Sequence, residues 1–151
     1  MQSTFEKLNL KNGKQILVLG APESFEPELA SLRDVTILRE LQAAKRVEFS
    51  LAFVTKQKEV DTLATAIAKR VQGDAVVWFA YPKGSSKKYK CQFNRDHGWE
   101  VLGKAGFEPV RMVAIDEDWS AVRFRRAEFI KTLNRPKQYA MSAQGKAKAK
   151  G

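Results

Sequence analysis

The sequence has little cysteine, no long apolar run and few acidic residues in its second half. Cys91 is the only cysteine among 151 residues, so neither an internal disulfide nor a cysteine-based zinc site can form. The longest apolar run, residues 75–81, has about seven residues, whereas a membrane-spanning helix needs roughly twenty. No apolar core of a secretion signal is found near the start. These absences predict a cytoplasmic protein in a reducing compartment, without contact to a membrane.

Positive charge is concentrated in the second half of the chain. The sequence carries 27 Lys and Arg against 17 Asp and Glu, a formal net charge of +10. Residues 1–81 contain 11 basic and 10 acidic side chains, whereas residues 82–151 contain 16 and 7. Within that half, residues 82–95 have five basic side chains and no acid, and residues 123–151 have nine basic side chains and only Glu128. A partner of this half is therefore expected to be anionic.

Three apolar segments have the composition of strands that are buried on both faces. They are residues 14–20 (KQILVLG), 47–54 (VEFSLAFV) and 75–81 (AVVWFAY), and residues 35–38 form a shorter candidate. Residues 56–71 lie between the last two strands and have helical periodicity. The apolar positions on one face of this helix are Val60, Leu63, Ala64, Ile67, Ala68 and Val71. A strand, a crossover helix and a second strand in this order predict a parallel sheet.

Turn and capping residues set the expected helix ends. Gly73 is expected to end the crossover helix, and Ser24 is expected to cap a short helix over residues 25–31. Weaker helical signals follow at residues 127–133.

The C-terminal part predicts a hairpin followed by a tail. Residues 109–115 and 120–126 flank the acidic turn at 116–118, a pattern typical of an antiparallel hairpin. Residues 137–151 lack core-forming side chains and are predicted to be a disordered basic tail, which leaves a single α/β domain over residues 1–136. The elements together predict a Rossmann-like three-layer α/β sandwich. Its sheet is mostly parallel, has about six strands and is closed by the C-terminal antiparallel hairpin.

Four strings carry a resemblance to known proteins: LVLGAPESFEPEL, VWFAYPKGSSKKYK, GWEVLGKAGFEPVRMVAIDEDWSAVRFR and EFIKTLNR. Together they resemble a bacterial family that is catalogued as a domain of unknown function. The resemblance covers residues 5–135 and is most specific at Tyr81-Pro82-Lys83 and at residues 116–124. It implies a small cytosolic Rossmann-like protein and supplies no catalytic residues. The closing strand, helix and hairpin are also similar in order to the second half of S-adenosylmethionine-dependent methyltransferases, which is a similarity of fold alone.

Cofactor binding in the methyltransferase class needs a glycine-rich turn after the first strand, where backbone approaches the ligand. Gly20 is the only glycine at that point, and Glu40 is the acid near the end of the second predicted strand that would hold ribose hydroxyls. The Gly-Lys pairs at 13–14 and 145–146 lack the spacing of a phosphate-binding P-loop. The sequence therefore predicts no cofactor.

The loop after the strand at residues 75–81 is the sharpest local feature. It reads YPKGSSKKYK and follows a buried strand at the carboxyl edge, where open α/β sheets place their ligands. Backbone amides and hydroxyls, together with lysine ammonium groups, would neutralise an anion there. The residues predicted to bind an anion are Lys83, Gly84, Ser85, Ser86, Lys87 and Lys88. The alternative interpretation is a solvated loop whose lysines keep it soluble.

No set of residues in the sequence indicates catalysis or metal binding. His97, the only histidine, lies beside Asp96, but no nucleophile is tied to it by a motif. The three acids at 116–118 are expected to form a polar turn, because successive strand residues point to opposite faces. The sequence therefore predicts no catalytic residue and no metal ligand.

Three functions fit these residues. The leading hypothesis is a non-catalytic domain that binds an anionic ligand or a phosphorylated partner at the carboxyl edge of the sheet. The second is non-specific nucleic-acid binding through phosphate contacts from Arg123, Arg125, Arg126, Lys146, Lys148 and Lys150. The third is a degenerate or divergent relative of S-adenosylmethionine-dependent methyltransferases. No recognition motif for nucleic acid is present, and the oligomeric state is not indicated.

Overall fold

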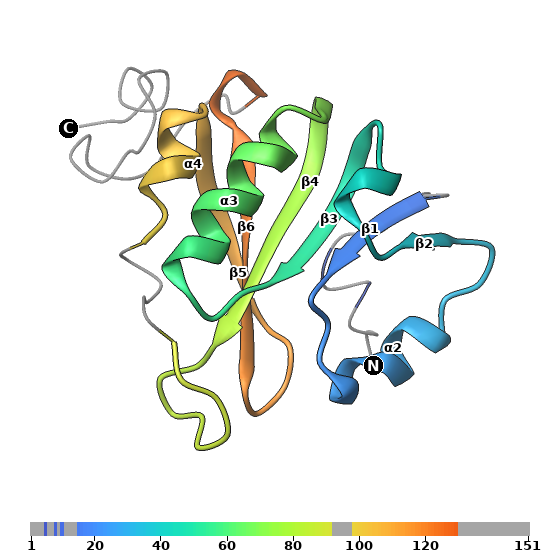
Figure 1. The fold of residues 1–151 in the computed structure, drawn as a ribbon, viewed down its shortest axis with the longest axis vertical. Helices are drawn as coiled ribbons and strands as arrows, with labels where there is room; N and C mark the ends of the chain where they lie inside the picture. The colour runs from blue at the N-terminus through green and yellow to red at the C-terminus, as the bar shows by residue number, and fades with distance from the viewer. Residues whose placement is uncertain (1–4, 6–7, 9, 11–14, 92–97, 130–151) are drawn as a thin grey trace.

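The computed structural model describes residues 5, 8 and 10 and the segments 15–91 and 98–129 (Figure 1). Its main element is one six-stranded sheet with the strand order β2-β1-β3-β4-β6-β5. The strands are β1 (Gln15–Leu19), β2 (Thr36–Leu38), β3 (Val47–Phe53), β4 (Val71–Pro82), β5 (Phe107–Ala114) and β6 (Trp119–Arg126). β1 to β4 are parallel to one another, and β6 is antiparallel to both β4 and β5. The predicted fold class, including the closing hairpin, is confirmed.

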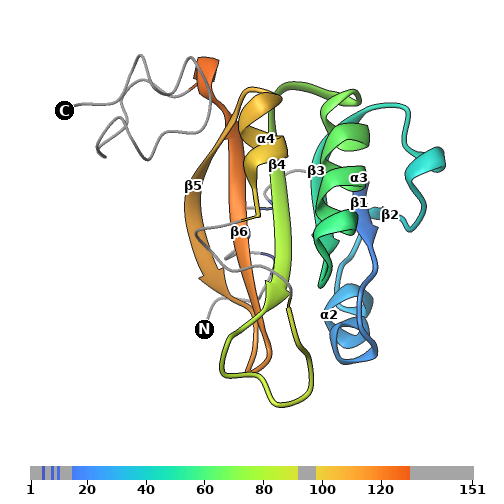
Figure 2. The ribbon, with the colours of Figure 1, turned by 60° about the vertical axis from the view of Figure 1, so that its left-hand side comes forward.

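Helices and side chains cover both faces of the sheet. On one face, α3 (Gln57–Ala68) and α4 (Glu100–Lys104) bury Ile67 and Leu102 against the strands, and both helices lie on the same side in Figures 1 and 2. On the other face, α2 (Glu26–Ala30) and the neighbouring Phe25 pack with Leu8 and Trp78. The Trp78 Nε1 donates a hydrogen bond to the Leu8 carbonyl at 2.7 Å. The sheet is therefore the middle layer of three, which explains why its strands are apolar on both faces.

The boundary between α3 and β4 differs from the predicted one. β4 begins at Val71 rather than at residue 75, and α3 ends at Ala68. Val71 pairs with Val47 of β3, and the Val47 amide donates to the Arg70 carbonyl at 2.9 Å. Pairing with β3 thus continues the strand backwards through a region where the apolar spacing still fits a helix. Gly73 lies inside β4 with φ +63°, so the prediction that it ends the helix is wrong.

The start of α2 also differs from the prediction. Residues Glu23–Phe25 form the short 3₁₀ turn η1, so Ser24 lies inside a turn and does not cap a helix. The N-cap of α2 is Phe25, which makes no side-chain capping hydrogen bond, and Pro27 occupies the first turn. A buried aromatic ring fixes this helix start in place of a polar cap, because Phe25 packs on Phe53 with ring centroids 5.0 Å apart.

The hairpin turn between β5 and β6 is held by its own acid. Asp116 Oδ1 accepts hydrogen bonds from the amides of Asp118 and Trp119, at 2.8 and 2.9 Å. After β6, Ala127–Phe129 form the 3₁₀ turn η3. The rest of the helix predicted to follow, the domain boundary at 136 and the predicted tail at 137–151 lie outside the described residues. None of the described helices is long and apolar enough to cross a membrane.

Candidate functional site

Two neighbouring cavities open at the carboxyl edge of the parallel strands. The larger has a volume of about 680 Å³ and lies beyond the end of β4. The smaller has a volume of about 480 Å³ and lies beyond the ends of β1 and β3. Tyr89 lines both cavities, so the loop of residues 83–91 forms part of the wall between them. Open α/β sheets bind their ligands at this edge, which makes these cavities the candidate site.

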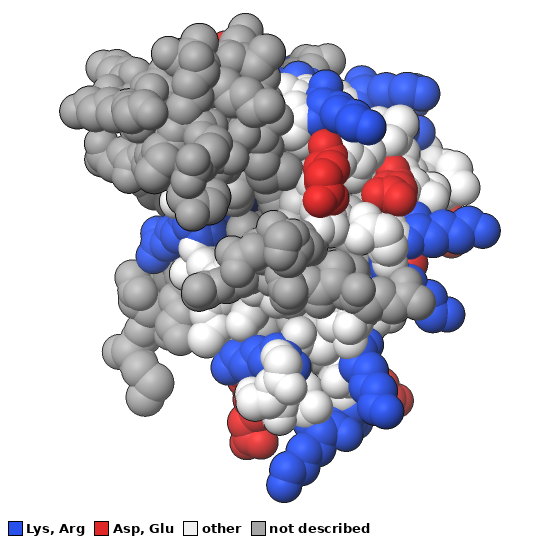
Figure 3. All heavy atoms as spheres, turned by 90° about the vertical axis from the view of Figure 1, so that its left-hand side faces the viewer, with Lys and Arg blue, Asp and Glu red and all other residues white. Residues whose placement is uncertain are grey.

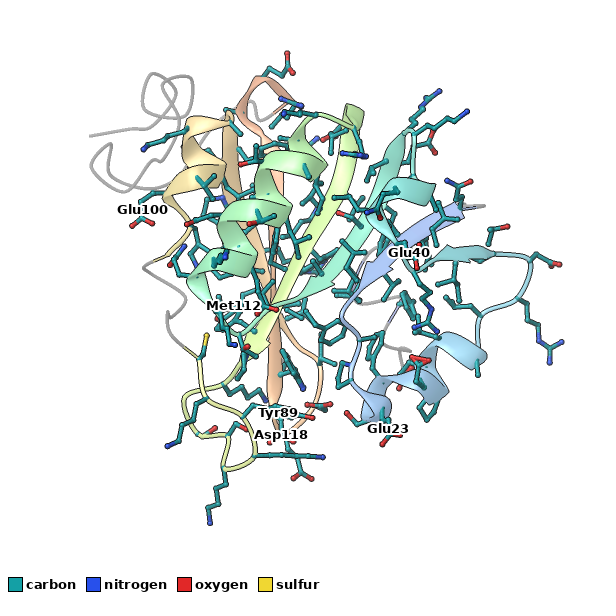
Figure 4. All side chains as sticks on the ribbon, viewed as in Figure 1. Glu23, Glu40, Tyr89, Glu100, Met112 and Asp118 are labelled. Carbon is teal, nitrogen blue, oxygen red and sulfur yellow. The ribbon has the colours of Figure 1, made fainter. Side chains whose placement is uncertain are left out.

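The loop of residues 83–91 is fastened to the turn between β5 and β6. The Lys83 amide donates to the Asp118 carbonyl at 2.8 Å, and Ser86 Oγ donates to Asp118 Oδ1 at 2.8 Å. Ser86 Oγ also accepts a hydrogen bond from the Tyr89 amide at 3.1 Å. Tyr89 and Asp118 accordingly lie together at the lower end of the molecule (Figure 4). Ser86 therefore holds the loop in shape, and its hydroxyl is already engaged within the protein.

The larger cavity joins a cationic rim to an apolar wall. Among the described residues that line it, Lys83 and Lys90 are the charged ones, and none is Asp or Glu. The apolar wall includes Tyr81, whose hydroxyl lies 3.6 Å from Met112 Sδ. Met112 is 43% exposed although it is a large apolar residue. A cavity with two ammonium groups and an exposed thioether has the composition of a site for an anion that also carries apolar surface.

The structure divides the six residues predicted to bind an anion. Lys83, Gly84 and Ser86 line the larger cavity, and Lys88 lines the smaller one. Ser85 and Lys87 line neither of these two cavities.

Sequence reasoning missed several lining residues of the larger cavity. Among them are Lys90, Tyr81, Met112 and Ser120. Lys90 stands two residues beyond Lys88 and belongs to the same charged run. Met112 comes from the edge strand β5, and nothing along the sequence connects it with the loop.

The smaller cavity lies at the topological switch point of the sheet. The chain passes from β1 to β2 on one side of β1 and then to β3 on its other side, so the order of the strands reverses here. Aromatic side chains from Phe53, Tyr89 and Trp119 line this cavity, together with the carboxylates of Glu23 and Glu59. The Trp119 ring contacts both of the others: its centroid lies 5.1 Å from that of Phe53 and 4.9 Å from that of Tyr89.

Glu59 has a second role at the start of α3. Its Oε1 accepts hydrogen bonds from the amides of Thr55 and Lys56 at 2.9 and 3.0 Å, and from Thr55 Oγ1 at 3.2 Å. Partial burial of the carboxyl acts to raise its pKa, but these hydrogen bonds and the Lys56 charge outweigh burial and lower the pKa of Glu59. Glu59 is therefore ionised at neutral pH.

The residues at the switch point do not fit the cofactor of methyltransferases. A Cβ at Gly20 would lie 2.9 Å from the Phe53 carbonyl oxygen, so the glycine is needed for contact between β1 and β3. Pro22 has no amide to offer, and its carbonyl accepts a hydrogen bond from Phe25. Glu40 is exposed, does not line the cavity and stands well apart from Glu23 and Tyr89 (Figure 4). The glycine-rich turn and the ribose-binding acid that this cofactor requires are thus both missing from the cavity.

The arginines predicted to bind nucleic acid are mostly engaged within the protein. Arg125 forms a bidentate ion pair with Asp74 at 2.6 and 2.8 Å. Arg126 donates to the Ala68 carbonyl at 2.9 Å, and its guanidinium lies 4.8 Å from the centroid of the Phe107 ring. Arg123 is partly buried, and burial lowers its pKa, with smaller contributions from Arg125 and Arg111 against an opposing one from Asp74. Lys146, Lys148 and Lys150 lie outside the described residues.

The described side chains on the face in Figure 3 carry charges of both signs. In Figure 3, blue basic side chains stand in separate groups with red acidic side chains beside them. Within the described segments, no group of three His, Cys, Asp or Glu side chains is placed to hold a metal ion. His97 and Asp96 lie outside those segments.

Comparisons with solved structures identify the fold. The chain is similar to the fibrillarin pre-rRNA processing protein of Methanococcus jannaschii, with a TM-score of 0.51 and 13% identity over 83% of this chain and 69% of that one. It is similar to TrmN of Thermus thermophilus, with a TM-score of 0.51 and 11% identity over 82% and 47% of the two chains. It is also similar to phosphoethanolamine N-methyltransferase 2 of Haemonchus contortus, solved with S-adenosylhomocysteine, with a TM-score of 0.51 and 11% identity over 83% and 38%.

The likeness covers less than half of the length of each of the last two proteins. No protein-family profile and no curated protein sequence matches this chain. At identities this low, the comparisons establish a fold and no activity. The chain has the Rossmann-like fold of S-adenosylmethionine-dependent methyltransferases.

Proposed function

We propose that this protein is a degenerate relative of S-adenosylmethionine-dependent methyltransferases that binds an anionic ligand in the larger cavity and transfers no methyl group. The proposal extends to the uncharacterised bacterial family that the LVLGAPESFEPEL and YPK strings resemble. Members of that family would share the methyltransferase fold without its cofactor site. The likeness of fold supports the relation to methyltransferases. Two observations support the loss of the cofactor: the turn at Gly20 is not glycine-rich, and Glu40 does not line the smaller cavity.

The charge of the larger cavity carries the second part. Lys83 and Lys90 line a volume of about 680 Å³, and none of the described residues lining it carries a carboxylate. Asp118, the acid that the loop contacts in the turn between β5 and β6, is engaged with Ser86 Oγ. Two ammonium groups attract an anion by direct charge and by hydrogen bonding. Tyr81 and Met112 add an apolar surface, so an organic phosphate or carboxylate fits better than a bare inorganic ion.

Titration of the full chain with phenyl phosphate and with inorganic phosphate tests this function. Lys83→Ala and Lys90→Ala are each expected to weaken phenyl phosphate binding at least about tenfold, because a hydrogen bond to a charged group contributes roughly 1.5–3 kcal/mol and about 1.4 kcal/mol corresponds to a tenfold change. Lys87→Ala is the matched control: it removes the same charge from the same loop at a residue that does not line the cavity. Its affinity should stay within about twofold of the wild type. Equal losses in all three variants would mean diffuse attraction and would refute a site.

The apolar wall supplies a second control. Met112→Ala should reduce the preference for phenyl phosphate over inorganic phosphate, since it removes exposed apolar surface from the cavity. An unchanged preference would show that the ligand does not reach β5. The nucleic-acid hypothesis stays a prediction, and salt-dependent binding of DNA that survives in Lys83→Ala and Lys90→Ala would favour it.

A further inference from the structure

The smaller cavity has a chemical character opposite to that of the larger one. The charged residues among its described lining are Glu23, Glu59 and Lys88, so acids outnumber bases there. Glu23 is exposed at the start of η1, and Glu59 is held ionised by the hydrogen bonds at the start of α3. An anion entering this cavity would meet two carboxylates, whereas a cation would be attracted by both.

Aromatic rings surround the same space at steep angles. The Trp119 ring meets Phe53 edge-on, at 79° and 5.1 Å between centroids, and meets Tyr89 at 52° and 4.9 Å. Trp119 and Phe53 are 3% and 5% exposed and are fixed by the core, while Tyr89 is only partly buried. Tyr89 is therefore the ring that a bound cation can reach, and a ring face attracts cations through its negative quadrupole.

The protein already places a cation of its own against one of these rings. Lys88 Nζ lies 5.6 Å from the centroid of Tyr89, within the range of a cation–π contact. Lys88 itself is exposed and stands on the loop of residues 83–91. An exposed lysine that folds back over a ring of a carboxylate-lined cavity marks the position where positive charge is favoured.

We propose that the smaller cavity is a site for a small organic cation with a quaternary ammonium group, which replaces the Lys88 ammonium against the Tyr89 ring. Glu23 and Glu59 neutralise the cation, and Phe53 and Trp119 form the apolar wall that favours an alkylated cation over a metal ion. This site is distinct from the anion site and does not depend on it, because Tyr89 is the only described residue that lines both cavities.

The test compares choline with 3,3-dimethylbutanol, which has the same shape without the charge, in titrations of the full chain followed by amide chemical shifts. Choline is expected to bind in the millimolar range and the neutral alcohol at least about fivefold more weakly, since an exposed cation–π contact contributes about 0.5–1 kcal/mol and the carboxylates add to it. Equal binding of the two would show that the cavity is merely apolar. If choline at about 50 mM, a 50-fold molar excess over the protein, produced no shift changes, the proposal would be overturned.

Three substitutions locate the site. Lys88→Met should tighten choline binding about two- to fivefold, because it removes the competing cation. Lys87→Met, the same change at the neighbouring residue that does not line this cavity, should have no effect. Weaker binding in Lys88→Met would overturn the proposal, since Lys88 would then serve as a ligand for anions. Glu23→Gln should weaken choline binding about twofold or more, and Tyr89→Phe, which keeps the ring, should leave it within twofold of the wild type.

Discussion

Substitution of Gly20 tests whether the stability of the fold requires a glycine in the turn after β1. Gly20 has φ +69°, and a Cβ there would meet the Phe53 carbonyl oxygen at 2.9 Å. Gly73 has a similar φ of +63°, but no described atom lies within 4 Å of the position a Cβ would take. Gly84 has no φ in the left-handed region, and no described atom lies close to the position of its Cβ. The three glycines therefore separate backbone strain from steric contact.

The expected losses follow from these geometries. An alanine in the left-handed region costs about 1–2 kcal/mol, and restriction of the unfolded chain offsets about 0.4–1 kcal/mol of this cost. Gly73→Ala should therefore lower the free energy of unfolding by about 1 kcal/mol, and Gly84→Ala should change it by less than about 0.5 kcal/mol. Gly20→Ala has the same strain and must also displace a backbone carbonyl. Overpacking of this kind costs a further 1–3 kcal/mol, so the total is about 2–4 kcal/mol.

Urea denaturation followed by tryptophan fluorescence measures all three variants under one set of conditions. The order of stability should be Gly84→Ala, then Gly73→Ala, then Gly20→Ala. If Gly20→Ala lost no more than Gly73→Ala, the contact between Gly20 and Phe53 would not constrain the fold. The glycine would then be free to serve a ligand, and the argument against a cofactor would lose its main support.

Three further predictions concern α3 and the core. Ile67→Ala should lower the free energy of unfolding by about 2–5 kcal/mol in urea, whereas Leu63→Ala should lose less than half as much, because Ile67 is 1% exposed and Leu63 only partly buried. Ser50→Ala should leave the melting temperature unchanged or raise it, since Ser50 Oγ is buried without a hydrogen-bond partner in the described part of the chain; a clear fall would reveal a missed partner. Glu59→Gln should lose about 0.5–1 kcal/mol at pH 7, a small value because Glu59 is only slightly buried and solvent screens its charge. The folded-state pKa of Glu59 is lowered, so this stabilisation is present above the unfolded value of about 4.3 and is lost as the pH falls through the folded value. A difference between wild type and Glu59→Gln that persists at pH 2 would contradict the assignment.

The sequence alone was sufficient to predict the central strands. β1, β3 and β4 are short apolar segments separated by a periodic helix, and burial on both faces leaves few other arrangements for such segments. The hairpin of β5 and β6 was also predictable, because the acidic turn at Asp116 interrupts two apolar segments. These features depend on local composition and on the period of the apolar residues.

Features that depend on contacts distant in sequence were not predictable. β4 begins at Val71 because Val47 pairs with it, and the helical spacing of Val71 gave the opposite indication. The fastening of Ser86 by Asp118 joins residues 32 positions apart, so a hydroxyl expected to bind an anion is engaged elsewhere. The larger cavity likewise combines Lys90 with Met112 of the edge strand. Sequence reasoning placed the loop at the carboxyl edge of the sheet, where both cavities open, and could not say which side chains meet there.

The affinity of the full chain for S-adenosylhomocysteine tests the central claim most directly. Isothermal titration calorimetry is expected to show no saturable binding up to about 1 mM ligand, a limit that corresponds to about 4 kcal/mol of binding free energy. The reason is that Gly20 is committed to its contact with Phe53 and that Glu40 stands outside the cavity. Saturable binding with a micromolar Kd that is weakened in Glu40→Ala would contradict the account, because it would show that the cofactor site is intact.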